Sequence, residues 1–234
     1  AAIIRVHMAR TATRTGREAA EKLAWSGLFD NMGAILGMMT AGGIFTWIVV
    51  TDGISDIALS LSLDLLPVYM KDIGGMTVEQ VGWLDSVFGV FSMAANILAG
   101  WLADRQGERL VIALGFVLTG IGMAVFLYVG GFWGFAISWA LSGVGVGMIG
   151  PAYQSLTSKV VPDRLRGTAF GVVRGSLGFF SLPAPFVGSQ LWNRVTPRFP
   201  FQLTAGALLA AAVPAWFRFK LSDGEEEPAS DEGA

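Results

Sequence analysis

The chain has 234 residues, of which 53% are hydrophobic and 15% charged, and its formal net charge is −2. A soluble domain of this length carries more charge on its surface, so the composition favours a protein that is solvated by lipid. The scattered basic residues and the slightly negative net charge argue against nucleic-acid binding. Because the chain has no cysteine and a single histidine, His7, we expect no disulfide, no metal site and no cofactor.

Residues 1–42 precede the first apolar segment of membrane-spanning length, and we expect them to form a basic cytoplasmic leader. The leader starts with alanine and lacks the apolar core of a signal peptide, which favours a fragment of a longer protein. Its second part, Ala24–Gly42, is mostly apolar. We expect this part to be an interfacial helix that leads into the first span. The alternative is an additional span, but a seventh crossing would spoil the charge asymmetry described below.

Six apolar segments follow, and we expect each to cross the membrane as a helix. The stretch Leu110–Ser158 holds 49 residues without one acidic or basic side chain. As a single helix it would be about 74 Å long, more than twice the roughly 30 Å thickness of the hydrocarbon layer, so it must cross twice. The expected spans are Gly43–Met70, Val81–Ala103, Leu110–Val129, Phe132–Leu156, Gly167–Leu191 and Phe201–Phe217.

The predicted fold class is therefore an all-α membrane protein, a bundle of six transmembrane helices over residues 43–220. Residues 221–234 are acidic and almost without apolar side chains, so we expect a disordered cytoplasmic tail. Lys and Arg prefer the cytoplasmic side of short loops. With the six spans above, twelve basic residues fall on one side of the membrane and three on the other. This asymmetry predicts a multi-pass protein of the cell (inner) membrane with both termini in the cytoplasm.

The connection between the second and third spans carries the pattern Gly100-x-x-x-Asp104-Arg105-x-Gly107-x-Arg109. Gly100 would let a neighbouring helix approach closely, and Gly107 would permit a tight turn. Asp104 could interact with an arginine or with the partially positive start of a helix. The pattern resembles the signature loop of the major facilitator superfamily, which implies a conformational latch. Glu108 departs from it, because the superfamily usually has a basic residue there.

Three further stretches resemble the same superfamily: Leu66-Pro67-Val68-Tyr69, Val161–Gly171 and Pro200-Phe201. Full members have twelve spans in two related halves. The basic leader resembles the linker between halves and the acidic tail looks terminal, so the resemblance points to a C-terminal half whose N-terminal half is missing. It implies a secondary transporter, not an enzyme, that moves a small solute by alternating access. Proton coupling is a further hypothesis.

Three charged residues lie near the middle of the expected spans, where burial of a charge costs at least about 2.5–3.5 kcal/mol. Asp52 and Asp56 are one turn apart on the same face of the first span. Arg174 lies at a comparable depth in the fifth span, so we predict an ion pair between Arg174 and one of the two aspartates. A mid-membrane carboxylate without a partner could carry a proton. The alternative is a structural ion pair without a role in turnover.

Polar and small residues in the spans add further candidates. Asn96 in the second span either contacts substrate or bonds to a neighbouring helix, and the sequence does not decide between these. Gly150-Pro151 is expected to kink the fourth span at a helix that lines a cavity. Glycines four residues apart allow close helix crossings. They occur as Gly143 and Gly147, and as Gly167, Gly171 and Gly175.

Asp52, Asp56, Arg174 and Asn96 are thus the candidates for solute contact or proton coupling. The expected partners are a small solute, protons, the lipid bilayer and the missing N-terminal half. The rival hypothesis is a membrane scaffold or assembly factor built on the same helices. Such a scaffold would not need carboxylates in the middle of the membrane.

Overall fold

The computed structural model describes residues 30, 32–34, 36–37 and 43–219, apart from the side chains of 172–177 and 179–180. The described residues contain helices and no strand, which confirms the predicted all-α fold. The helices are α2 (Ile44–Leu63), α3 (Leu66–Asp72), α4 (Val78–Gln106), α5 (Glu108–Phe126), α6 (Gly131–Val160), α7 (Asp163–Ser181), α8 (Ala184–Arg194) and α9 (Phe199–Arg218).

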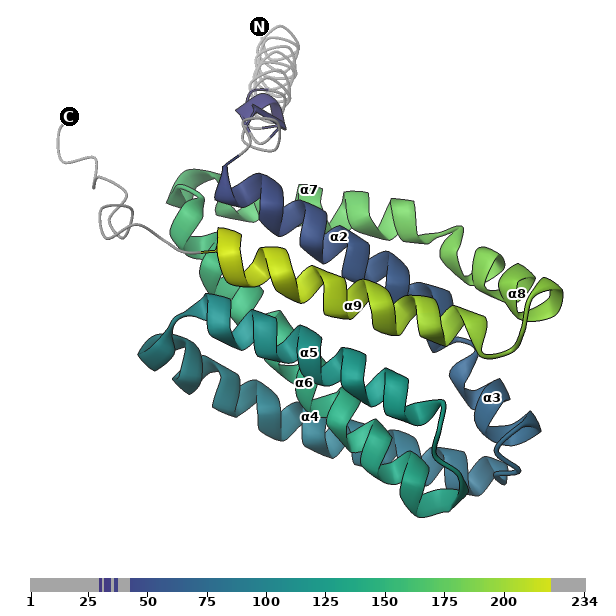
Figure 1. Cartoon of the computed structure of the whole chain (residues 1–234). Helices are drawn as coiled ribbons and strands as arrows, with labels where there is room; N and C mark the ends of the chain where they lie inside the picture. The colour runs from purple at the N-terminus through teal and green to yellow at the C-terminus, as the bar shows by residue number, and fades with distance from the viewer. Residues whose placement is uncertain (1–29, 31, 35, 38–42, 220–234) are drawn as a thin grey trace, which may run out of the picture.

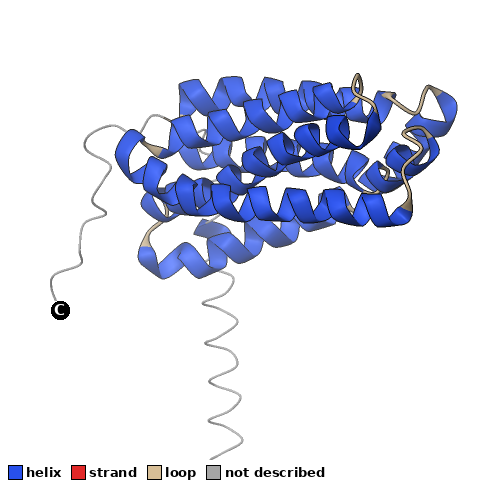
Figure 2. Cartoon of the chain, turned by 90° about the horizontal axis from the view of Figure 1, so that it is seen from below, coloured by secondary structure: helices blue, strands red, loops and turns tan. Residues whose placement is uncertain are grey.

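The long helices run side by side in two layers (Figure 1). One layer holds α4, α6 and α5, with α6 packed against both neighbours. The other holds α2, α9 and the pair α7–α8, and the layers meet chiefly where α5 packs on α9. Seen from below, the bundle is elongated along the helix axes, and its loops gather at the two ends (Figure 2).

The two ends of the bundle differ in what they carry. The first end, which we name the loop end after its turn at Gly107, is where α2 begins and α9 ends. The turn at Gly107 joins α4 to α5 there. At the opposite end, α3 leads into α4, residues 127–130 join α5 to α6, and residues 195–198 join α8 to α9.

Five helical segments in the described part are long and apolar enough to cross a membrane, namely 44–72, 78–106, 108–126, 131–160 and 199–218. They correspond to the first, second, third, fourth and sixth expected spans. Many of their large apolar side chains are exposed, on α4 above all, as the helices of a protein solvated by lipid require. Hydropathy therefore identified these five helices correctly.

The fifth expected span, Gly167–Leu191, is wrong as a single helix. The structure has two helices there, α7 and α8, interrupted at Leu182 and Pro183. Pro183 has no N–H to donate and disfavours helical geometry at Leu182, so the helix ends before it. The first expected span is likewise interrupted, at the turn Asp64-Leu65 ahead of α3.

Other expectations about the helices have mixed outcomes. α6 continues as one helix through Gly150 and Pro151, so the kink there stays a prediction. Of the stretch Ala24–Gly42, residues 30, 32–34 and 36–37 are helical and exposed, and the rest of it lies outside the described residues. The acidic tail, from Leu221 on, also lies outside them.

The glycines of α6 allow it to touch α4 closely. A Cβ atom added at Gly147 would lie 2.2 Å from the carbonyl oxygen of Ser92, and one added at Gly143 would lie 2.7 Å from that of Phe88. The predicted close crossing is therefore confirmed for this pair of glycines. No such contact with a described residue exists at Gly167 or Gly171, where an added Cβ would meet nothing within 4 Å.

Aromatic side chains mark both ends of the bundle. At the loop end, three arginines lie over tryptophan rings: Arg105 over Trp101 at 4.3 Å, Arg109 over Trp216 at 5.1 Å and Arg218 over Trp47 at 4.9 Å. Exposed aromatic side chains near the opposite end are Trp83, Tyr128 and Trp133. Tryptophan and tyrosine collect at the two membrane–water interfaces, so these residues frame the part of the bundle that lies in hydrocarbon.

We expect Gly147→Ala to lower the free energy of unfolding by about 1–3 kcal/mol, because the new methyl group must push α4 away from α6. The matched control is Gly206→Ala in α9, where an added Cβ has open space and should be neutral or slightly stabilising. Thermal unfolding of the detergent-purified protein measures both effects. Equal stability of the two variants would contradict the close crossing.

Candidate functional site

A hydrogen bond between two buried side chains joins the layers in the interior of the bundle. The hydroxyl oxygens of Thr51 on α2 and Tyr153 on α6 lie 2.6 Å apart. Thr51 gives its single proton to the carbonyl oxygen of Trp47, at 2.7 Å, so Tyr153 is the donor between the two side chains. Both residues are buried. This bond fixes the part of α2 that carries the two aspartates.

The two aspartates lie on α2 about 12 and 18 Å along the axis from its first residue. Both side chains are half-buried. Asp52 follows Thr51 directly and interacts electrostatically with Tyr153. Asp56, one turn further along, accepts a hydrogen bond from the hydroxyl of Ser181. Both predicted carboxylates therefore belong to one polar region in the interior of the bundle.

Ser181 brings the end of a helix into this polar region. It is the last residue of α7, directly before the interruption at Leu182 and Pro183. The final carbonyl groups of a helix have no partner within that helix, so an interruption inside a membrane leaves polar backbone groups in the interior. In transporters, interrupted helices of this kind typically form substrate and ion sites near the middle of the membrane. Asp56 thus lies where α2 meets an interrupted helix.

The other two predicted site residues have different outcomes. The backbone of Arg174 lies in α7, which contacts α2, but its side chain is outside the described part, so the ion pair with Asp52 or Asp56 stays a prediction. Asn96 is exposed on α4 and forms no hydrogen bond within the described residues. It therefore does not bond to a neighbouring helix of the described bundle.

The loop from Gly100 to Arg109 has the turn that the sequence predicts. Gly107 ends α4 and precedes α5 with a φ of 87°, a conformation that disfavours residues with a Cβ. Arg105 and Arg109 lie over tryptophan rings, as described above. Asp104 is exposed and forms no ion pair with any described residue. An ion pair of Asp104 with an arginine is therefore not formed within the described residues, and its interaction with a helix start stays a prediction.

Glu108 takes part in a cluster that the sequence did not reveal, in which its carboxylate is buried and Lys159 is exposed. Its side chain is 4% exposed, lies 2.8 Å from the ammonium group of Lys159, and accepts a hydrogen bond of 2.7 Å from Ser155. The cluster joins the first residue of α5 to the last turns of α6. A carboxylate in place of the usual basic residue is thus compensated by a lysine on the neighbouring helix. No local pattern predicts such a pair, because its partners are 51 positions apart.

Sequence reasoning also missed Thr51, Tyr153 and Ser181. One signal was available for Tyr153, because tyrosine in a span usually lies at the interface and this one lies two residues beyond Pro151, inside α6. A tyrosine in the interior needs a hydrogen-bond partner. Thr51 offered only its position next to Asp52.

The sequence profile described as the Major Facilitator Superfamily matches residues 48–234. The chain belongs to this superfamily. The match includes the loop around Asp104, the cluster at Glu108 and both aspartates of α2. The predicted resemblance is therefore confirmed, and a multi-pass membrane protein follows from the apolar helices together with the family.

Two relatives in the superfamily are resistance proteins by name. The chain is 29% identical to the quinolone resistance protein NorA of Staphylococcus aureus (strain MRSA252) over 152 residues, which are 65% of this chain and 38% of NorA. It is 30% identical to the multidrug resistance protein MdtG of Yersinia enterocolitica over 164 residues, 68% of this chain and 39% of MdtG. The matched part of this chain thus spans less than half the length of these relatives.

A solved structure has the same fold. The crystal structure of the peptide transporter POT in complex with sulfate superposes with a TM-score of 0.63 at 22% sequence identity. The match covers 74% of this chain and 36% of the POT chain. The bundle therefore has the fold of about half a superfamily transporter, as the sequence predicted.

We expect Lys159→Gln to destabilise the protein by about 1–3 kcal/mol, because the Glu108 carboxylate then stays buried without its countercharge. The double variant Glu108→Gln with Lys159→Gln should regain most of this loss. A double-mutant cycle from thermal unfolding measures the coupling. As a control, the pair Asp163–Arg166, whose carboxylate is exposed, should give a coupling of at most about 1 kcal/mol. Additive effects at Glu108 and Lys159 would refute a stabilising cluster.

Proposed function

We propose that this chain supplies half of a secondary transporter, which moves a small solute across the membrane by alternating access. The observation that carries the proposal is the hydrogen bond from Ser181 to Asp56, at an interruption between α7 and α8. An interrupted helix beside a half-buried carboxylate provides polar groups in the interior of the membrane, where a transported solute or ion must be held for a time.

We further propose that Asp52 and Asp56 carry the coupling proton. Their half-buried carboxylates lie in a medium of low dielectric, where uptake of a proton removes the cost of the charge. Arg174 is the proposed partner of one carboxylate in the unprotonated state. Asn96 is proposed to contact the solute, since it is exposed on α4 and has no hydrogen-bond partner in the described bundle.

The proposed partner of this chain is a second six-helix half. Support comes from α4, where an added Cβ at Gly82, Gly89 or Gly100 would meet nothing within 4 Å. In contrast to Gly143 and Gly147 of α6, these glycines are not used for packing within the described part. Small residues on an exposed face allow another helix to approach closely. The loop around Asp104 would then act as the latch between the two halves.

The relatives suggest which solutes to test first. NorA and MdtG are resistance proteins by name, the former against quinolones. We therefore propose export of an amphipathic, drug-sized molecule, with a fluoroquinolone as the first test compound. The same assay separates the transporter from the scaffold, because a scaffold gives no flux.

In proteoliposomes that contain the complete protein, an imposed pH gradient should drive fluoroquinolone uptake, and collapse of the gradient should stop it. Asp56→Asn and Asp52→Asn should each lower the driven rate about tenfold or more, because an amide cannot take up and release the proton. Asp64→Asn is the matched control, since Asp64 is exposed at the end of α2. Transport that ignores the gradient would rule out proton coupling, and no flux with any solute would favour the scaffold.

The proposed topology places the loop end in the cytoplasm of the cell, inside the inner membrane. Cysteines introduced one at a time into a cysteine-free background test this on intact cells. A membrane-impermeant maleimide should label Asn193→Cys at the opposite end and leave Gln106→Cys and Arg164→Cys unlabelled until the cells are opened. All three residues are exposed. Labelling of Gln106→Cys and Arg164→Cys from different sides would refute the six-span arrangement.

A further inference from the structure

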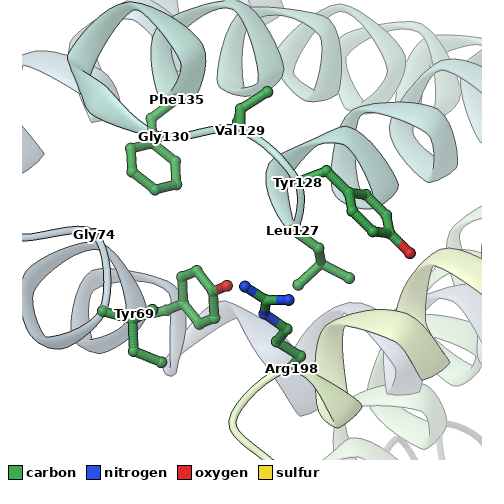
Figure 3. A pocket seen from close by; sticks show the side chains of 9 residues that line it. Tyr69, Gly74, Leu127, Tyr128, Val129, Gly130, Phe135 and Arg198 are labelled. Atoms are coloured by element: carbon green, nitrogen blue, oxygen red, sulfur yellow. The ribbon is translucent and has the colours of Figure 1, made fainter.

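A polar cavity lies at the opposite end of the bundle, away from the aspartates of α2. It has a volume of about 350 Å³ and opens between α3, the connection of residues 127–130 and the start of α9 (Figure 3). Polar groups reach it from Tyr69 and Arg198, and apolar walls come from Leu127 and Phe135. None of its lining residues is acidic.

Tyr69 is held rigidly and directs an unpaired hydroxyl into this cavity. The residue is 3% exposed, and its ring contacts Phe126 and Phe201 at centroid distances of 5.2 and 5.1 Å. Its hydroxyl forms no hydrogen bond with any described residue. A hydroxyl on a buried side chain normally has a partner, so this one is free for a ligand or for water.

Arg198 brings a cation to the same place. It precedes the first residue of α9, and its side chain extends from there into the cavity, so that the guanidinium group and the Tyr69 hydroxyl point toward one another (Figure 3). Arg198 forms no ion pair with a carboxylate of the described residues. A guanidinium group presents its N–H donors in a planar fork that matches the two oxygens of a carboxylate.

The remaining wall favours an organic ligand over a bare inorganic ion. Phe135 forms part of it, and this ring can lie there only because position 74 is glycine, where an added Cβ would be 2.7 Å from the ring. The ring of Phe135 and the side chain of Leu127 offer apolar surface beside the two donors. A hydrocarbon group attached to a carboxylate would cover that surface.

We propose that this cavity is a binding site for a small organic carboxylate, held by the Arg198 guanidinium and the Tyr69 hydroxyl. The site is separate from the aspartates of α2, and its existence does not depend on the proposed transport reaction. With the proposed topology it faces the outside of the cell.

The test is binding of butyrate, a carboxylate with one hydrocarbon chain, to the complete detergent-purified protein, measured by thermal unfolding at constant pH and ionic strength. Butyrate should raise the unfolding temperature in a saturable manner. Arg198→Gln and Tyr69→Phe should each raise the apparent Kd about tenfold or more, because each removes a donor to a charged oxygen. Arg194→Gln is the matched control, since Arg194 is an exposed arginine at the end of α8 that does not line the cavity.

Tyr69→Phe keeps the packed ring and removes only one oxygen, so it separates loss of binding from loss of folding. Butyramide, which has the same carbon chain without charge, should give no stabilisation. Equal butyrate affinity in the parent protein, Arg198→Gln and Tyr69→Phe would overturn the site. Sulfate that binds as tightly as butyrate, with the same dependence on Arg198, would overturn the preference for an organic ligand.

Discussion

The lack of water in the hydrocarbon layer is the constraint on which this bundle depends, because each buried polar group must find its partner within the protein. Several buried hydroxyls of the described helices meet it by donating to helix carbonyl groups, although the buried Ser142 hydroxyl has no hydrogen-bond partner among the described residues. Thr119 donates to Gly115 within α5, Ser138 donates to Gly122 across the α5–α6 contact, and Thr204 donates to Ala58 across the α2–α9 contact. The hydrogen bonds between helices fix the positions of these helices relative to one another. Apolar contacts alone would leave the helices free to slide.

The lack of water in the hydrocarbon layer also decides where the charged side chains lie. Arginines of the loop end extend over tryptophan rings, so their stems cover apolar surface while the guanidinium groups stay at the interface. Glu108 is buried at this end, but Lys159 and Ser155 lie within bonding distance. Only α2, among the described helices, carries carboxylates well inside the bundle. A purely structural role is therefore harder to argue for the two aspartates of α2 than for the other charged groups of the described helices.

Sequence reasoning succeeded where the physical signal is local. Hydropathy located five long helices, and the glycine at position 107 and the glycine pair of α6 identified a turn and a close crossing. It failed where the signal depends on folding. The partners in Thr51–Tyr153 and Asp56–Ser181 are 102 and 125 positions apart, and only the packed bundle brings them together. The interruption at Pro183 was local, yet the apolar run around it outweighed the proline in the prediction of one span.

The two layers meet at two seams of different character, and this difference explains why the polar residues lie where they do. Between α5 and α9 the seam is apolar and tight, since an added Cβ at Gly120 would lie 2.8 Å from Leu209. Between α2 and α6 the contact is sparse and polar, with the bond of Thr51 to Tyr153 at its centre. Complementary apolar surfaces hold the first seam, whereas a directional hydrogen bond between two buried hydroxyls holds the second. Both carboxylates of α2 lie on the helix at the sparse, polar seam.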